Sequence, residues 1–157
     1  MARVVADFNE PLRLLEGAGE MSERSGKDTF HIGTEAMQAE HRSQFAMVDA
    51  LCDALRQGRD QSEIVDILEQ VIDYTHVHFM AEQLLMRLHD YPESQVHCLE
   101  HAKVLEQLQA LREGVQAGTV TNALDVIETI RKQLRAHIGG SDLALSKFLG
   151  DCGVPIP

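Results

Sequence analysis

The sequence predicts an all-α protein, an up-down-up-down four-helix bundle with a short N-terminal extension. Apolar residues recur three and four positions apart rather than two, aromatic residues make up only 4% of the chain, and Trp is absent. At 157 residues the chain has the usual size of one domain and can bury one core. Four amphipathic helices with short connections pack most simply as such a bundle.

The first two helices are separated by a turn near Gly58. We expect the first helix from about Thr34, a plausible N-cap, to Gly58. The second follows it and runs to about His89, and Asp60 and Glu63 have the spacing of a capping box at its start. One stripe of the first helix carries Met37, His41, Phe45, Val48 and Cys52.

The sequence "DYP" at 90–92 ends the second helix and starts the third, because Pro is tolerated in a first turn but not inside a helix. The third helix is expected to end near Gly114 or Gly118, and the fourth to begin near Thr121. The inner stripe of the fourth helix is formed by Leu124, Ile127, Ile130, Leu134 and His137.

We divide the chain into an N-terminal extension and linker (1–30), the bundle (31–150) and a C-terminal tail (151–157). In the extension, a helix-compatible set of apolar residues precedes the Gly- and Ser-rich stretch "GAGEMSERSGKD". Two interpretations stay open: a short helix folded over one end of the bundle, or a contact for a protein partner or a second copy of the chain. The apolar residues are Val5, Phe8, Leu12 and Leu15.

Charge and cysteine content exclude several classes of protein. A net charge of -11 opposes nucleic acids and anionic membrane surfaces, which attract clustered Lys and Arg. No apolar run approaches the roughly 18 to 20 residues of a membrane span, and the N-terminus lacks the pattern of a secretory signal. We therefore expect a cytoplasmic protein without membrane insertion. Cys52, Cys98 and Cys152 form neither a disulfide framework nor a CxxC pair.

Each expected helix carries residue types that bind metals on its inner face. Residues four apart leave the same side of a helix, as do the His and Glu of "HFMAE" and the two His of "HCLEH". Buried imidazoles and carboxylates are costly without a partner, and metal is the usual partner inside a bundle. The set is His41, His78, Glu82, His97, His101, His137 and Asp142.

Five histidines and two carboxylates suit two iron ions. If both carboxylates and one oxo or hydroxo group bridge the ions, the histidines must divide three and two. One ion is then saturated and the other keeps one open position. The mixed set of imidazoles and carboxylates argues against a closed structural zinc site, which prefers thiolates.

These motifs resemble those of the hemerythrin family. "HFMAE", "HCLEH" and "HIGGSD" are similar to that family's HFxxE, HxxxH and HIxxxD, and "EHRSQF" is similar to the segment around its first ligand. The resemblance covers about residues 30 to 150 and implies a four-helix bundle with a non-haem di-iron centre. It implies that the centre binds O2 reversibly at the open iron and reduces it to a bound hydroperoxide. It places His97, His101 and His137 on the saturated iron, His41 and His78 on the open one, and Glu82 and Asp142 as bridges.

The pocket around such a centre should be dry, since dryness slows oxidation of the iron pair. Neutral histidines supply less negative charge than a carboxylate-rich set, which favours reversible O2 binding over O–O cleavage. No distal polar residue is required. The candidate lining residues lie one helical turn or so from the ligands, and each also suits an ordinary core position. They are Phe45, Phe79, Met86, Leu105 and Leu108.

Two positions depart from the family pattern: Gln133 stands where Trp is common, and Gln38 where an acidic residue is common. If Gln133 faces the site, we expect a wetter pocket and faster autoxidation. The spacing of five between His137 and Asp142 falls about 140° off a regular helical face. It predicts a kink or π-bulge near residues 139–140 that turns Asp142 inward.

The expected function is O2 carriage, storage, delivery or sensing, with no enzymatic activity. The alternative is a di-iron enzyme that reduces peroxide or nitric oxide, but the sequence offers no obvious proton donor or electron-donor docking surface for it. A third possibility is a metal that only holds the bundle together. His31, expected before the first helix, His76 and His89 are interpreted as surface or capping residues.

Overall fold

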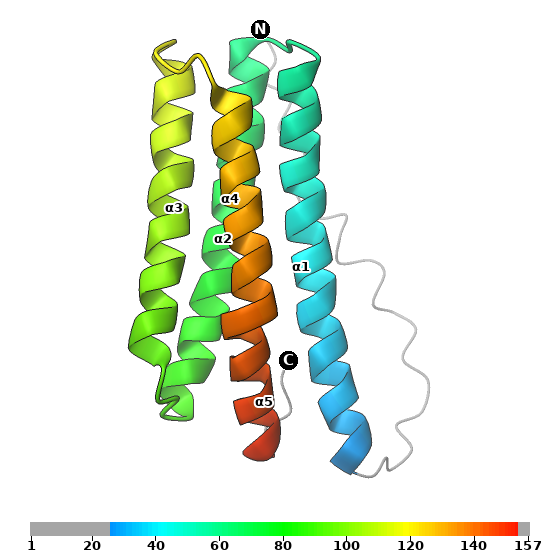
Figure 1. Ribbon diagram of the computed structural model, residues 1–157. Helices are drawn as coiled ribbons and strands as arrows, with labels where there is room; N and C mark the ends of the chain where they lie inside the picture. The colour runs from blue at the N-terminus through cyan, green and yellow to red at the C-terminus, as the bar shows by residue number, and fades with distance from the viewer. Residues whose placement is uncertain (1–25, 154–157) are drawn as a thin grey trace, which may run out of the picture.

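Four helical rods run antiparallel along a common axis in the computed structural model, which describes residues 26–153 (Figure 1). Each rod packs against its neighbour in the chain, and α4 also packs against α1, which closes the bundle. The predicted all-α, up-down-up-down bundle is confirmed. Its elements are α1 (Gly26–Arg56), α2 (Gln61–Leu88), α3 (Ser94–Gln116), α4 (Ala123–His137), the π-helix η2 (Ile138–Asp142) and α5 (Leu143–Asp151).

The first helix begins earlier than predicted, at Gly26 rather than near Thr34. His31, expected before this helix, therefore lies within it, as does the expected boundary at residue 30. The residue between these starts that disfavours a helix most is Gly33, and one glycine costs a helix about 1 kcal/mol. The predicted apolar set of residues 5–15 lies outside the described residues.

The predicted capping box at the start of α2 is wrong. Asp60 is the N-cap residue, but its side chain makes no capping hydrogen bond. Glu63 instead accepts a hydrogen bond from Arg59 at 2.8 Å, which turns its carboxylate away from the backbone N–H of the cap residue.

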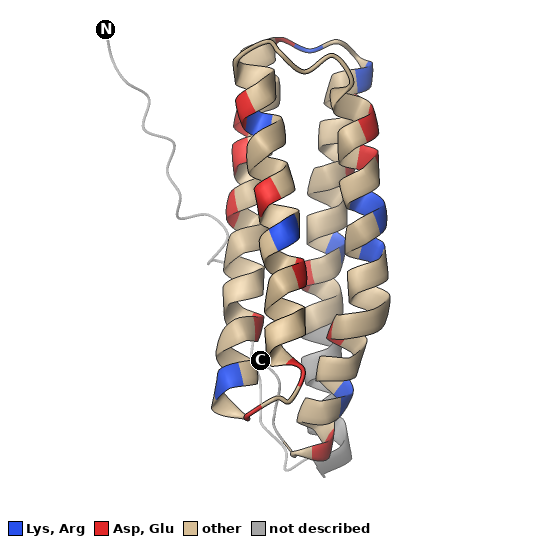
Figure 2. Ribbon diagram, turned by 60° about the vertical axis from the view of Figure 1, so that its left-hand side comes forward, with Lys and Arg blue, Asp and Glu red and all other residues tan. Residues whose placement is uncertain are grey.

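Charged residues are distributed over the outer surface of the bundle, with acidic and basic positions intermixed along the helices in view (Figure 2). Ion pairs Arg56–Glu128 at 2.7 Å and Arg131–Asp49 at 2.8 Å join α1 to α4. Both pairs are exposed, so each contributes roughly 0 to 1 kcal/mol. Among the described helices, none combines the length and apolar character needed to cross a membrane.

The apolar core consists of two clusters. The larger contains residues of α1 to α4. The smaller contains residues of α1, α2 and α5 and one residue of the connection between α2 and α3. In every rod the predicted metal-binding residues fall between residues of the two clusters, so a polar layer divides the core. The smaller cluster is formed by Met37, Met86, Tyr91, Leu145 and Leu149.

The predicted π-bulge is confirmed. Residues Ile138–Asp142 form one turn of π-helix between α4 and α5, and Asp142 is only 2% exposed. A π-turn takes in one extra residue, which corrects the rotation that a spacing of five would otherwise cause. Gly139 and Gly140 are not among the glycines with positive φ, and a Cβ at either would meet nothing within 4 Å. The bulge therefore needs no glycine.

We predict that Gly139→Ala and Gly140→Ala each raise the free energy of unfolding by about 0.5 to 1 kcal/mol, because Ala loses less backbone entropy in a helix. Chemical denaturation of the apoprotein measures this. Gly118→Ala is the matched control, and it should destabilise the protein because Gly118 has φ +66°. A loss of stability in the first two variants would show that glycine is required at the bulge.

Candidate metal centre

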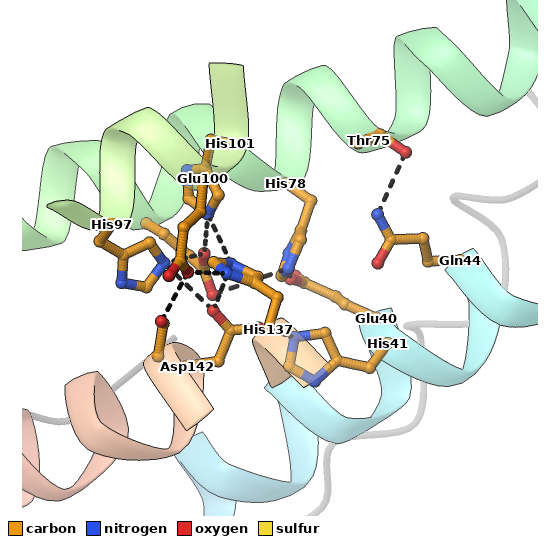
Figure 3. A network of polar contacts seen from close by, with 12 residues as sticks. Glu40, His41, Gln44, Thr75, His78, His97, Glu100, His101, His137 and Asp142 are labelled. Atoms are coloured by element: carbon orange, nitrogen blue, oxygen red, sulfur yellow. Dashed lines mark hydrogen bonds and ion pairs between the residues drawn. The ribbon is translucent and has the colours of Figure 1, made fainter. Parts of the chain in front are cut away.

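All seven predicted residues are buried at one level of the bundle and form two groups that share both carboxylates (Figure 3). Within each group, the candidate ligand atoms all lie within 4.8 Å of one another. One group therefore offers three imidazoles and the other two. The first group is Glu82, His97, His101, His137 and Asp142, and the second is His41, His78, Glu82 and Asp142.

Asp142 connects the two groups through its two oxygens. Oδ1 lies 3.1 Å from Nε2 of His97 and 2.9 Å from Nε2 of His137. Oδ2 lies 3.1 Å from Nε2 of His41. The π-bulge is what brings this carboxylate inward, so the local backbone geometry allows one side chain to reach both groups.

Glu82 connects the same two groups from α2. Its Oε2 lies 3.1 Å from Nε2 of His101 and 3.4 Å from Nε2 of His97, and its Oε1 lies 3.6 Å from Nε2 of His78. Both carboxylates thus have one oxygen toward each group. This is the arrangement required of two carboxylates that bridge a pair of ions.

Most of these buried atoms lack a hydrogen-bond partner despite their proximity. Nine nitrogen and oxygen atoms of the seven side chains are buried without one, including all four oxygens of Glu82 and Asp142. Nε2 of His101 and Nε2 of His137 face each other at 2.9 Å. Acceptor atoms that converge on a common space without donors favour a cation between them, so the donor set fits a metal.

Two surface carboxylates orient two of the imidazoles. Nδ1–H of His78 donates to Glu40 at 2.8 Å, and Nδ1–H of His137 donates to Glu100 at 2.7 Å. Ser141 also donates to Glu100, at 2.6 Å. A proton fixed on Nδ1 leaves the Nε2 lone pair directed inward, which is the tautomer that binds a metal.

Sequence reasoning missed Glu40 and Glu100. A signal was available, since each stands directly before a histidine of the centre, in "EHRSQF" and "LEH". Adjacent residues on a helix point about 100° apart, so each acid faces the neighbouring helix and binds a histidine there rather than the one beside it.

The charges of the centre shift the pKa values of its groups. Burial alone would lower the pKa of His97, but its contacts with Asp142 and Glu82 prevail and raise it to about 9. Burial opposes ionisation of the two carboxylates, yet contacts with His137 and His101 respectively, among other imidazoles, hold the pKa of Asp142 and of Glu82 below the usual range. Without a metal, His97 therefore retains a proton beside two ionised carboxylates, whereas burial lowers the pKa of His101.

Among the five expected lining residues, Phe79 lies directly against the centre. Its ring stacks on His101 with centroids 3.7 Å apart and planes 6° apart. Leu108 belongs to the larger apolar cluster, against which Phe45 and Leu105 pack, and Met86 belongs to the smaller cluster.

Two cavities border the centre. One of about 350 Å³ is lined by Gln133 and His137, among others, and one of about 230 Å³ by Gln38, His41 and Asp142, among others. Both glutamines that depart from the family pattern therefore lie beside candidate ligands. Oε1 of Gln133 is buried without a hydrogen-bond partner, and whether this residue makes the pocket wetter stays a prediction.

The remaining histidines with described side chains lie outside the centre. His76 is exposed, and His89 is the C-cap of α2, as predicted. Cys52 is buried, Cys152 is exposed, and Cys98 packs against the smaller cluster.

Comparisons with known proteins agree on one family. The family model of the hemerythrin HHE cation-binding domain matches residues 32–149. Bacteriohemerythrin of Methylococcus capsulatus is 31% identical over 113 residues, 72% of this chain and 82% of that protein. Bacteriohemerythrin of Pseudomonas paraeruginosa is 29% identical over 92 residues, 59% of this chain and 60% of that protein. The match thus spans three-fifths of the Pseudomonas relative. No solved structure matches the chain significantly.

We predict that Glu100→Ala lowers metal affinity about 10- to 100-fold, because His137 loses the acceptor that orients it. Competition with a chelator measures the affinity for iron. Glu106→Ala is the matched control, since Glu106 is an exposed acid on the same helix. Equal affinities of the two variants would contradict the orienting role of Glu100.

The apoprotein should lose stability as the pH rises from about 6.5 to about 9. A group whose pKa is raised in the folded state contributes its full stabilisation at pH values below its unfolded-state pKa. That stabilisation is lost as the pH rises through the folded-state pKa, which is about 9 for His97. Urea denaturation at several pH values, with chelator present, measures it. The pH dependence of the stability should be unchanged in His76→Gln and weaker in His97→Gln. A flat profile in the wild type would contradict the protonated imidazole.

Proposed function

Because the chain belongs to the hemerythrin family, we propose that its buried polar layer holds two iron ions and binds O2 reversibly. The observation that carries this proposal is the sharing of two carboxylates between a group of three imidazoles and a group of two. A closed structural site would have no reason to divide its ligands unequally, whereas an unequal division leaves one ion with room for an external ligand.

In this proposal the two groups hold one ion each, with an oxo or hydroxo group as the remaining bridge. The iron pair supplies the electrons and the open coordination position for O2. His97, His101 and His137 hold one ion, and His41 and His78 hold the other. Glu82 and Asp142 span the pair, since each has one oxygen toward each group.

The surrounding residues orient the imidazoles and limit access of water. Glu40 and Glu100 retain the Nδ1 protons of His78 and His137, so these rings direct Nε2 inward. Phe79 covers His101 with its ring, and the apolar clusters on either side close the layer along the bundle axis. Two carboxylates and five neutral imidazoles leave a small positive charge on a ferrous pair, which a buried site can hold.

The proposed role is that of an O2-binding protein in carriage, storage, delivery or sensing rather than of an enzyme. Two relatives bear the name bacteriohemerythrin, which agrees with this role. The same centre could serve peroxide or nitric oxide reduction, and the experiment below separates these uses.

We expect the anaerobically reduced, iron-loaded protein to develop a visible absorption band when titrated with O2, and to lose it when O2 is removed. His41→Ala should abolish the band, because it removes a ligand from the group of two imidazoles, whereas His76→Ala should keep it. A band that forms once and does not reverse would favour redox enzymology. No band in the iron-loaded wild type would contradict O2 binding and favour a merely structural metal.

A further inference from the structure

A buried polar pair lies beside the metal centre where a dry pocket was expected. Gln44 on α1 is 1% exposed and Thr75 on α2 is fully buried. Nε2 of Gln44 donates to Oγ1 of Thr75 at 3.1 Å. The other end of the amide, Oε1, is buried with no hydrogen-bond partner.

This pair adjoins the group of two imidazoles. Gln44 follows His41 by three residues and Thr75 precedes His78 by three, so each lies about one helical turn from a candidate ligand on the same face. The rings of His41 and His78 are themselves in contact, with centroids 4.9 Å apart. The three imidazoles of the other group come from α3 and α4, across the bundle.

The orientation of the amide leaves its oxygen free on the side of the centre. Figure 3 shows the nitrogen of Gln44 turned toward Thr75 and the oxygen turned away from it, toward the side of His78 and His41. Because Thr75 occupies the nitrogen, the free atom is an acceptor rather than a donor.

An unpaired carbonyl in this position destabilises the fold, and the hydrogen bond to Thr75 uses only the nitrogen of the amide. The amide is therefore explained better by a donor that is present during function than by packing. The donor must be small, since Gln44 and Thr75 are both almost fully buried. Water and other ligands with an O–H group meet this requirement.

We infer that Gln44 selects the ligand at the group of two imidazoles: its Oε1 accepts a hydrogen bond from water or another small hydroxyl-bearing ligand and disfavours ligands that only accept hydrogen bonds. This inference rests on the proposed function, because it requires an external ligand at that half of the centre. It specifies that a ligand that only accepts hydrogen bonds must compete there with a water held by Gln44.

Azide is the probe, because it is a small anion that accepts hydrogen bonds and donates none. We expect Gln44→Leu to bind azide about five- to tenfold more tightly than wild type in the oxidised, iron-loaded protein, since one net hydrogen bond to the competing water is lost. Optical titration measures the dissociation constant. Gln70→Leu is the matched control, an exposed glutamine on α2, and it should bind azide like wild type.

Thr75→Val provides a second variant of nearly unchanged shape. It leaves Nε2 of Gln44 without its acceptor, so the amide can present an N–H to the anion and azide should again bind more tightly. Weaker azide binding in Gln44→Leu, or binding equal to wild type, would overturn the inference. So would the absence of azide binding in both wild type and variant.

Unfolding of the apoprotein gives a readout that is independent of the iron. If Gln44 were only a packing residue, Gln44→Leu would lower the denaturation midpoint and weaken azide binding together, which would contradict the inference. We expect tighter azide binding even where the midpoint falls, because Gln44→Leu also removes the hydrogen-bond donor to the buried hydroxyl of Thr75. The O2 titration of the wild type tests the proposed function separately, since a reversible O2 band with no effect of Gln44→Leu on azide would remove only this inference.

Discussion

Two ionised carboxylates inside the bundle, Glu82 and Asp142, impose the constraint on which the rest of the centre depends. All the ion pairs that they make in the part of the chain with described side chains are with histidines. Their charge raises the pKa of His97 to about 9, so that without a cation in the layer this imidazole holds a proton. A metal pair removes the conflict, because it neutralises the carboxylates and takes the lone pairs of neutral imidazoles at once.

The same constraint determines how each of the four helical rods is rotated about its own axis. Each rod must present its ligands at one level, and apolar residues must cover that level from both sides, so the core divides into two clusters. α1 to α3 meet this demand with ordinary helical spacing. The fourth rod must deliver His137 and Asp142, five residues apart, and meets it by inserting a π-turn. The irregular backbone is thus a requirement of the site, consistent with the exposed surroundings of Gly139 and Gly140.

Sequence reasoning predicted the features that depend on periodicity within one helix. It missed the residues whose role depends on contacts between helices. The four rods and the π-bulge follow from spacing within a helix, as do the pairs of candidate ligands on α2 and α3, whereas His41 was a lone histidine on the stripe of α1. The partners Glu40 and Glu100 depend on which neighbouring helix an exposed residue faces, and this is set by packing. Sequence reasoning also missed Gln44. The predicted stripe of α1 included the adjacent Phe45, yet Gln44 is buried and Phe45 is only partly buried. A helix of 3.6 residues per turn drifts from any strict spacing of four.

The wall around the centre is therefore mixed rather than uniformly apolar. Phe79 covers one histidine, but glutamines stand at three borders of the centre: Gln38 and Gln133 in the flanking cavities and Gln44 in the layer beyond His41. Amides are polar without carrying a charge, so they leave the charge balance of the two carboxylates and the imidazoles unchanged. Under the proposed function, a small molecule binds at one half of the pair, and we expect the amides around it to set how strongly water competes for the same place.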